Sequence, residues 1–97
     1  MLALILENRV LGRGNRWLKI HVPGQSPLDH EPGTVVGLSV RIQQVPLRHA
    51  YTVSRADAAA RTLEFLIRVI PGGRLSPHLA SLEPGAELQI TGRGGHP

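Results

Sequence analysis

The nonapeptide from Pro46 to Ser54 carries residue types that suit a planar, anionic ligand. Tyr51, the only tyrosine in the chain, stands beside Thr52 and just after Arg48 and His49. An aromatic ring can stack on such a ligand, a hydroxyl can hydrogen-bond its edge, and a cation can pair with a phosphate. The same nine residues also fit a half-buried strand whose tyrosine packs on the core. Taken alone, they favour that structural interpretation.

A second candidate site is the run Gly72, Gly73, Arg74, Leu75 and Ser76, which opens a predicted helix. Glycines let the backbone approach a ligand closely, and free amides at the start of a helix attract phosphate. The guanidinium or the serine hydroxyl would add to this attraction. An ordinary loop with a serine cap is the alternative, and this run alone favours it. The Gly-Lys-Ser/Thr ending of a nucleotide-hydrolysing loop is absent.

Other kinds of chemistry have little support. The chain has no cysteine, its five histidines are widely spaced, and no catalytic or metal-binding set is predicted. The formal net charge of +4 indicates an anionic partner, either a nucleic acid or a phosphorylated ligand. Single-strand binders stack bases on several aromatics, whereas this chain has three in all. Nucleic acid is therefore ranked last among the partners.

Length and composition predict one small domain spanning residues 1–97, since such a chain has no room for a second core. With 11 glycines and 8 prolines, many turns and short strands are expected rather than long helices. The lack of cysteine fits a cytoplasmic protein. The apolar residues 1–6 are too short to span a bilayer or to act as a signal, so no membrane association is predicted.

Alternation of apolar and polar residues predicts the elements that would position these candidate sites. Strands are expected over 3–11, 16–22, 34–42, 46–54, 62–70 and 86–91, and a short helix within 74–82. In that helix Ser76 would be the N-cap and Pro77 the first helical residue. Val36, Leu38, Val40 and Ile42 should face the core, as should Leu88 and Ile90.

The segment 54–70 is ambiguous. Ser54 and Asp57 resemble a capping box before an alanine-rich stretch, which would start a helix. Leu63, Phe65 and Ile67 instead alternate with their neighbours as in a strand. We favour a hairpin with a connection over 55–61. Six strands and one helix then predict an all-β fold, a small six-stranded antiparallel Greek-key barrel, because closing the sheet removes its exposed edges.

Four motifs, taken in order, resemble the FAD-binding barrel of the ferredoxin–NADP reductase family, particularly its bacterial form. They are Ala50-Tyr51-Thr52-Val53-Ser54, Leu63-Glu64-Phe65, Gly73-Arg74-Leu75-Ser76 and Leu82-Glu83-Pro84-Gly85. The resemblance implies that Tyr51 stacks on the isoalloxazine and that Thr52 hydrogen-bonds near its redox nitrogens. It also implies that Gly73, Arg74, Leu75 and Ser76 hold the pyrophosphate, and that 62–70 is a strand.

The sequence departs from the family pattern in two respects. The family has an arginine for the flavin phosphate two positions before its tyrosine, where this chain has His49, with Arg48 one place earlier. A one-residue slip in a strand turns a side chain to the other face unless a bulge intervenes. The family also follows its barrel with a nucleotide-binding domain, and this sequence ends at Pro97.

Two hypotheses follow from the resemblance. In the first, the chain is a stand-alone flavin-binding module for electron transfer, at most the flavin-binding part of an NAD(P)H-dependent oxidoreductase. It would bind FAD or FMN, weakly or partially. It would need a protein partner with a nucleotide-binding or redox domain, or a homodimer that covers the flavin. In the second, the barrel has lost its flavin and serves as a structural or protein-interaction module.

Overall fold

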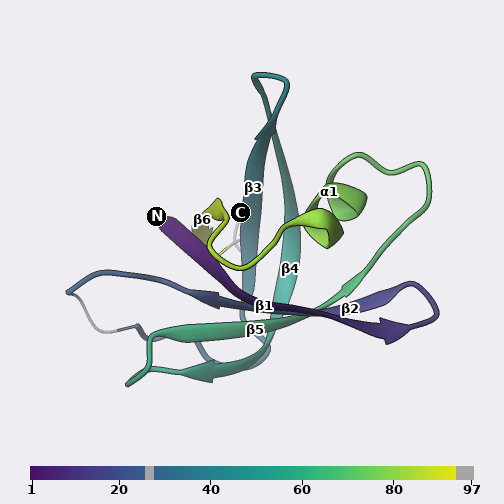
Figure 1. Cartoon of the computed structure of the whole chain (residues 1–97). Coiled ribbons are helices and arrows are strands. Elements are labelled where there is room, and N and C mark those ends of the chain that lie inside the picture. The colour runs from purple at the N-terminus through teal and green to yellow at the C-terminus, as the bar shows by residue number, and fades with distance from the viewer. Residues whose placement is uncertain (26–27, 94–97) are drawn as a thin grey trace.

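The computed structural model describes residues 1–25 and 28–93, which form a closed barrel of six antiparallel strands (Figure 1). The elements in chain order are β1 (Leu2–Gly12), β2 (Asn15–His21), β3 (Val35–Ile42), β4 (Val45–Asp57), β5 (Thr62–Arg68), α1 (Leu75–Ser81) and β6 (Glu87–Arg93). Around the barrel the order is β1-β2-β5-β4-β3-β6. The predicted fold, a six-stranded antiparallel barrel with one short helix, is confirmed.

The interior of the barrel is filled by the side chains that point inward from every second position of each strand. Val36, Leu38 and Val40 on β3 and Leu88 and Ile90 on β6 are buried in one core, as predicted, and Ile42 is partly buried against it. Phe65 is the largest fully buried side chain and comes from the strand whose assignment was ambiguous. Its burial follows from period-two alternation, since a helix would have turned half of these apolar residues to solvent.

The hairpin between β4 and β5 has a shorter connection than expected. The prediction of a loop over 55–61 was wrong, because β4 continues to Asp57 and pairs through Arg55, Ala56 and Asp57 with β5. A bulge between Val53 and Arg55 lets this extension stay in register. No helix begins at Ser54. Instead, Asp57 Oδ1 accepts a hydrogen bond from the amide of Ala60 at 3.0 Å and closes the turn.

Helix α1 begins at Leu75, two residues before the predicted first helical residue Pro77, and the prediction of Ser76 as its N-cap was wrong. Arg74 occupies the cap position without a side-chain hydrogen bond. Ser76 Oγ instead accepts a hydrogen bond from the amide of Ile70 at 3.0 Å. Strand β5 ends at Arg68, short of the predicted residue 70, because Arg68 pairs with Asn15, the first residue of its neighbour β2. Beyond it the amide of Val69 still bonds to the Gly14 carbonyl at 2.7 Å.

The barrel closes where β1 meets β6. Within the described residues, Leu2, Ala3 and Leu4 pair there with Gln89, Leu88 and Glu87. Next to them the backbone of Ile5 donates to Ala86 at 2.9 Å and accepts from Gly85 at 2.8 Å. A further pair of backbone hydrogen bonds, each of 2.7 Å, joins Met1 to Ile90. Leu75 and Leu79 of α1 are buried in the core, so the helix covers an end of the barrel (Figure 1). Among the described residues, α1 is too short to cross a membrane, and no longer apolar helix occurs.

Candidate functional site

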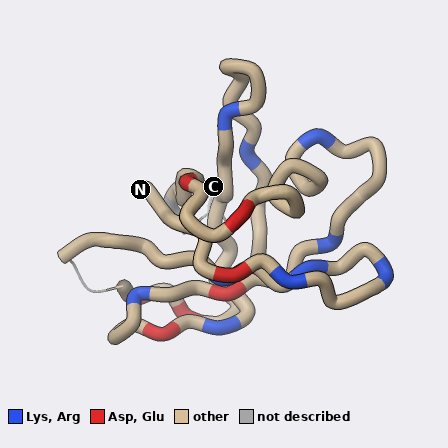
Figure 2. The backbone as a smooth tube through the Cα atoms, viewed as in Figure 1, with Lys and Arg blue, Asp and Glu red and all other residues tan. Residues whose placement is uncertain are grey.

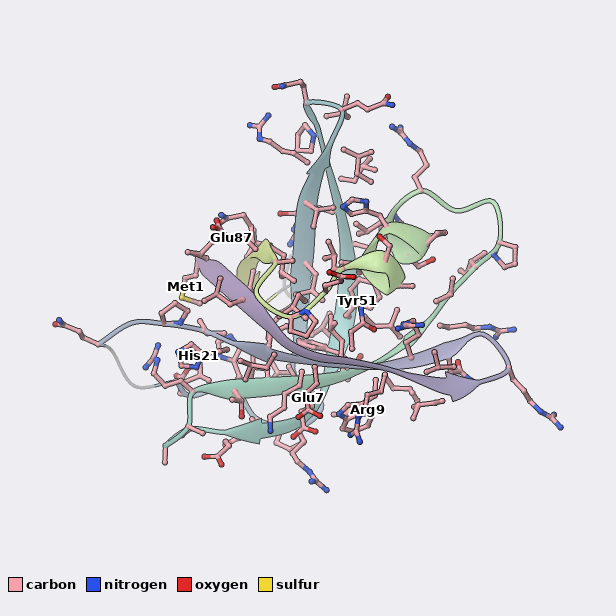
Figure 3. The ribbon with its side chains drawn as sticks, in the orientation of Figure 1. Met1, Glu7, Arg9, His21, Tyr51 and Glu87 are labelled. Carbon is pink, nitrogen blue, oxygen red and sulfur yellow. The ribbon has the colours of Figure 1, made fainter. Side chains whose placement is uncertain are left out.

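An open cleft of about 590 Å³ lies against β4, β5 and the loop that leads into α1. Seven of the eight residues proposed from the sequence line it: His49, Tyr51, Thr52, Gly73, Arg74, Leu75 and Ser76. Figure 3 shows Tyr51 on β4 beside α1. The fold thus brings together two candidate sites that lie more than twenty residues apart in the chain. Within the described residues, no group of three His, Asp or Glu side chains could hold a metal ion.

Tyr51 fits both interpretations of its strand, as a tyrosine that packs on the core and as a ring that a ligand could reach. It lies two residues before the buried Val53, so its ring packs partly against the core while it also lines the cleft. Burial raises the pKa of the Tyr51 hydroxyl above its ordinary value, because the phenolate would lose its hydration. The hydroxyl therefore remains a neutral hydrogen-bond donor throughout the physiological pH range.

Titration of Tyr51 should give a midpoint above pH ~10, the value of an unperturbed tyrosine. Because the folded-state pKa is the higher one, the stability that this group contributes is complete below pH ~10. That stability is lost as the pH rises through the folded-state pKa. Near-ultraviolet absorbance would follow the single tyrosine without interference from another. A midpoint at or below that of the urea-unfolded chain would contradict the expectation.

Arg48 is the one proposed residue that does not line the cleft. The pairing of β3 with β4 runs without a bulge from Val45 to Thr52, so nothing turns Arg48 to the side of His49. Its Nε donates a hydrogen bond to Thr91 Oγ1 at 2.7 Å, on the opposite side of the strand. The guanidinium lies directly over Gly37, where a Cβ atom would collide with it.

Two guanidiniums, those of Arg68 and Arg74, line the cleft together with His49, and no acidic residue does. Within the described residues, neither guanidinium makes a hydrogen bond or an ion pair. Figure 2 shows basic but no acidic positions along the loop between β5 and α1. The cleft therefore presents positive charge that is available to an anion.

Sequence reasoning missed five lining residues: Ala50, Ser54, Leu66, Arg68 and Ile70. Arg68 is the most informative of them, because it adds a cation from β5. The sequence pattern of β5 already indicated where this arginine points. Phe65 and Ile67 point inward, so Arg68, the next residue along the strand, must point outward. What was missing was the knowledge that the outer face of β5 borders the cleft.

Comparison with known proteins gives two kinds of match. The family model of oxidoreductase FAD-binding domains matches residues 3–97. The flavodoxin/ferredoxin–NADP reductase of Escherichia coli (strain K12) is 34% identical over 73 residues, which make up 75% of this chain and 28% of that protein. This chain thus spans little more than a quarter of the curated relatives that it matches.

Solved structures give the same picture. The ferredoxin reductase in carbazole 1,9a-dioxygenase aligns with a TM-score of 0.79 and 28% identity, over 95% of this chain and 27% of that one. A ferredoxin NADP+ reductase from Neisseria gonorrhoeae with bound FAD and NADP aligns with a TM-score of 0.76 and 22% identity, over 95% and 38% of the two chains. The second likeness, at this identity, concerns the fold alone.

Proposed function

Because the chain belongs to the oxidoreductase FAD-binding domain family, we propose that its cleft binds a flavin nucleotide and that residues 1–97 act as one flavin-binding module for electron transfer. The resemblance to the ferredoxin–NADP reductase barrel is confirmed by the family match. FAD is the first candidate cofactor, and FMN is the second. When bound, such a cofactor would accept and pass on reducing equivalents.

The observation that carries this proposal is the convergence of seven predicted residues on one cleft. Its volume, about 590 Å³, lies within the roughly 300–1,000 Å³ typical of small-molecule sites. In this proposal Tyr51 stacks on the isoalloxazine and the Thr52 hydroxyl hydrogen-bonds its edge. The backbone of Gly73, Arg74 and Leu75 and the Ser76 hydroxyl hold the phosphate. The Ser76 oxygen accepts from Ile70, so its own hydrogen remains available for donation.

Charge in the cleft supports a phosphate-bearing ligand but a modest affinity. Arg68 and Arg74 supply cations from two different elements. His49, however, stands where the family has an arginine, and an imidazole cannot form the two parallel hydrogen bonds that a guanidinium makes to a phosphate. We therefore propose weaker flavin binding than a complete reductase site would give.

The relatives matched here are much longer than this chain, and we propose that a nucleotide-binding or redox unit works together with the barrel. It would be supplied by a partner, or a second copy of the chain would cover the open side of the cleft. The setting proposed for this electron transfer is the cytoplasm, on the ground of the cysteine-free sequence.

A titration with FAD, FMN and riboflavin tests the proposal. Both nucleotides are expected to bind with dissociation constants in the micromolar range. Riboflavin, which lacks phosphate, should bind about tenfold or more weakly, because a charge-assisted hydrogen bond is worth about 1.5–3 kcal/mol. Quenching of flavin fluorescence gives the constants. Absence of binding by either nucleotide at tens of micromolar would reject a flavin site.

A second function, that of a structural or protein-interaction module without flavin, is favoured by one observation. The arginine nearest to the family position, Arg48, is held against Thr91 outside the cleft. If no flavin binds, we propose that the barrel is a structural or protein-interaction module.

A further inference from the structure

The C-terminal end of α1 is held by a side chain from the far end of the sequence. Asn8 Nδ2 donates hydrogen bonds to the carbonyls of Leu79 at 3.0 Å, Leu82 at 2.8 Å and Ala80 at 3.4 Å. The last carbonyls of a helix lack a full set of partners within the helix, so the Asn8 amide adds to the bond, of 3.2 Å, that the Leu79 carbonyl accepts from the Leu82 amide. One amide from β1 thus ties down the whole last turn.

Asn8 is itself held in one orientation. Arg16 Nε donates to Asn8 Oδ1 at 2.7 Å, and Arg16 Nη2 reaches the Asn8 carbonyl at 3.4 Å. Because the guanidinium occupies the oxygen, the amide nitrogen must face the helix. Asn8 and Arg16 therefore form a hydrogen-bonded link of fixed orientation between the β1–β2 hairpin and α1, which we call the strut.

A bulge in β1 accounts for the placement of this strut. Before the bulge, Ile5 is buried opposite Ile20, and the register then shifts between Ile5 and Glu7. After it, Asn8 stands opposite the buried Leu18, so an even-numbered residue now faces inward. Bulges commonly re-aim side chains in this way. Without the extra residue, Asn8 would point to solvent.

The strut matters for the cleft because little else fixes α1 along its axis. Its cap residue, Arg74, makes no side-chain hydrogen bond at the other end. Leu75 and Leu79 bury one face of the helix, but apolar contacts are not directional and permit sliding or rolling. Leu75 and Ser76 also line the cleft, and Ser76 is bonded to Ile70 at the start of the loop.

We propose that Asn8, locked by Arg16, is a positioning residue for the phosphate-binding side of the cleft. It touches no ligand. It holds α1 at the depth and rotation that place Leu75 and Ser76 in the cleft wall, and through Ser76 it orders the loop from Ile70 onward. This inference rests on the proposed function for its ligand, although the anchoring itself can be measured without one.

The test uses an isosteric variant, Asn8→Asp, which keeps an acceptor for Arg16 but loses both donors to the helix. FAD affinity should fall about tenfold or more, because the carbonyls at the end of the helix lose the Asn8 donor and face a carboxylate. Amide hydrogen exchange of residues 78–82 should become faster by a similar factor, while exchange in β3 and β4 stays the same. Gln43→Glu, in the exposed β3–β4 turn, matches the change in charge and should alter neither quantity.

Arg16→Met is the second variant and decides the matter if Asn8→Asp does not fold. It frees the Asn8 amide to rotate and should weaken FAD binding by a few fold, with faster exchange confined to α1. Unchanged exchange and affinity in both variants would overturn the proposal, as would an increase in exchange spread evenly over the barrel. If the unmodified protein binds no flavin, the proposed function fails. The amide hydrogen exchange of α1 in the two variants then decides by itself whether Asn8 anchors the helix.

Discussion

Replacing Tyr51 by Ala should weaken FAD and FMN binding by about 10- to 100-fold while the barrel stays folded. An aromatic platform is worth about 1–3 kcal/mol to a stacked ring, and each 1.4 kcal/mol is a factor of ten in affinity. The ring is only partly buried, so its loss should cost the fold about 1–2 kcal/mol. Fluorescence titration and thermal unfolding of the same samples would separate the two effects.

Tyr51→Phe is the matched control for this experiment. It keeps the stacking surface and removes only the hydroxyl, so flavin affinity should stay within a few fold of that of the unmodified protein. Suppose instead that Tyr51→Ala lowers the melting temperature and leaves flavin affinity unchanged. The tyrosine would then be part of the core and not of the ligand site.

Replacing His49 by Arg should tighten the binding of FAD and FMN by about 10- to 100-fold. A guanidinium can form two parallel, charge-assisted hydrogen bonds to a phosphate, and a hydrogen bond to a charged group is worth about 1.5–3 kcal/mol. Position 49 already lines the cleft together with Arg74 and Ser76, so the new group would need no movement of β4. Riboflavin affinity should not change, since riboflavin lacks the phosphate.

The double variant R48H/H49R provides a control with the same composition and net charge. If the position of the guanidinium decides affinity, the swap should bind FAD more tightly than the unmodified protein, although Arg48 is lost. Equal tightening of riboflavin would mean that the arginine acts on the ring system. No tightening by either variant would place the phosphate away from His49, toward Arg68 on β5.

Most of the barrel could be predicted because its strands obey one rule. On β3 and β6, side chains alternate between the core and solvent, and Val36, Leu38 and Ile90 follow that pattern without interruption. The rule does not say where a ladder stops. The extension of β4 to Asp57 depends on pairing with Thr62 across the hairpin, which is a property of two strands and not of one.

The residues that line the cleft were more predictable from the sequence than the hydrogen bonds that they make. Ser76 was correctly placed near the loop, yet its hydroxyl bonds to the Ile70 amide, a partner that helix-capping rules do not consider. Arg68 escaped notice because a lone outward arginine on a strand usually faces only solvent. Strand parity correctly set Arg48 and His49 on opposite faces of β4. Parity alone does not decide which residues line the cleft, since Thr52 shares the face of Arg48 and lines it.

The narrow junction between β1 and β6 has a consequence for how the chain folds. Its paired residues, such as Leu4 and Glu87, lie roughly 80 residues apart in sequence, so closing the ring has a large loop-closure entropy. The hairpins β1–β2, β3–β4 and β4–β5 are local and can form much sooner. We therefore expect the late step of folding to be the pairing of β6 with β3 and β1. Until β6 arrives, β1 and β3 are open edges, and this is the stage at which two chains would most readily exchange a strand.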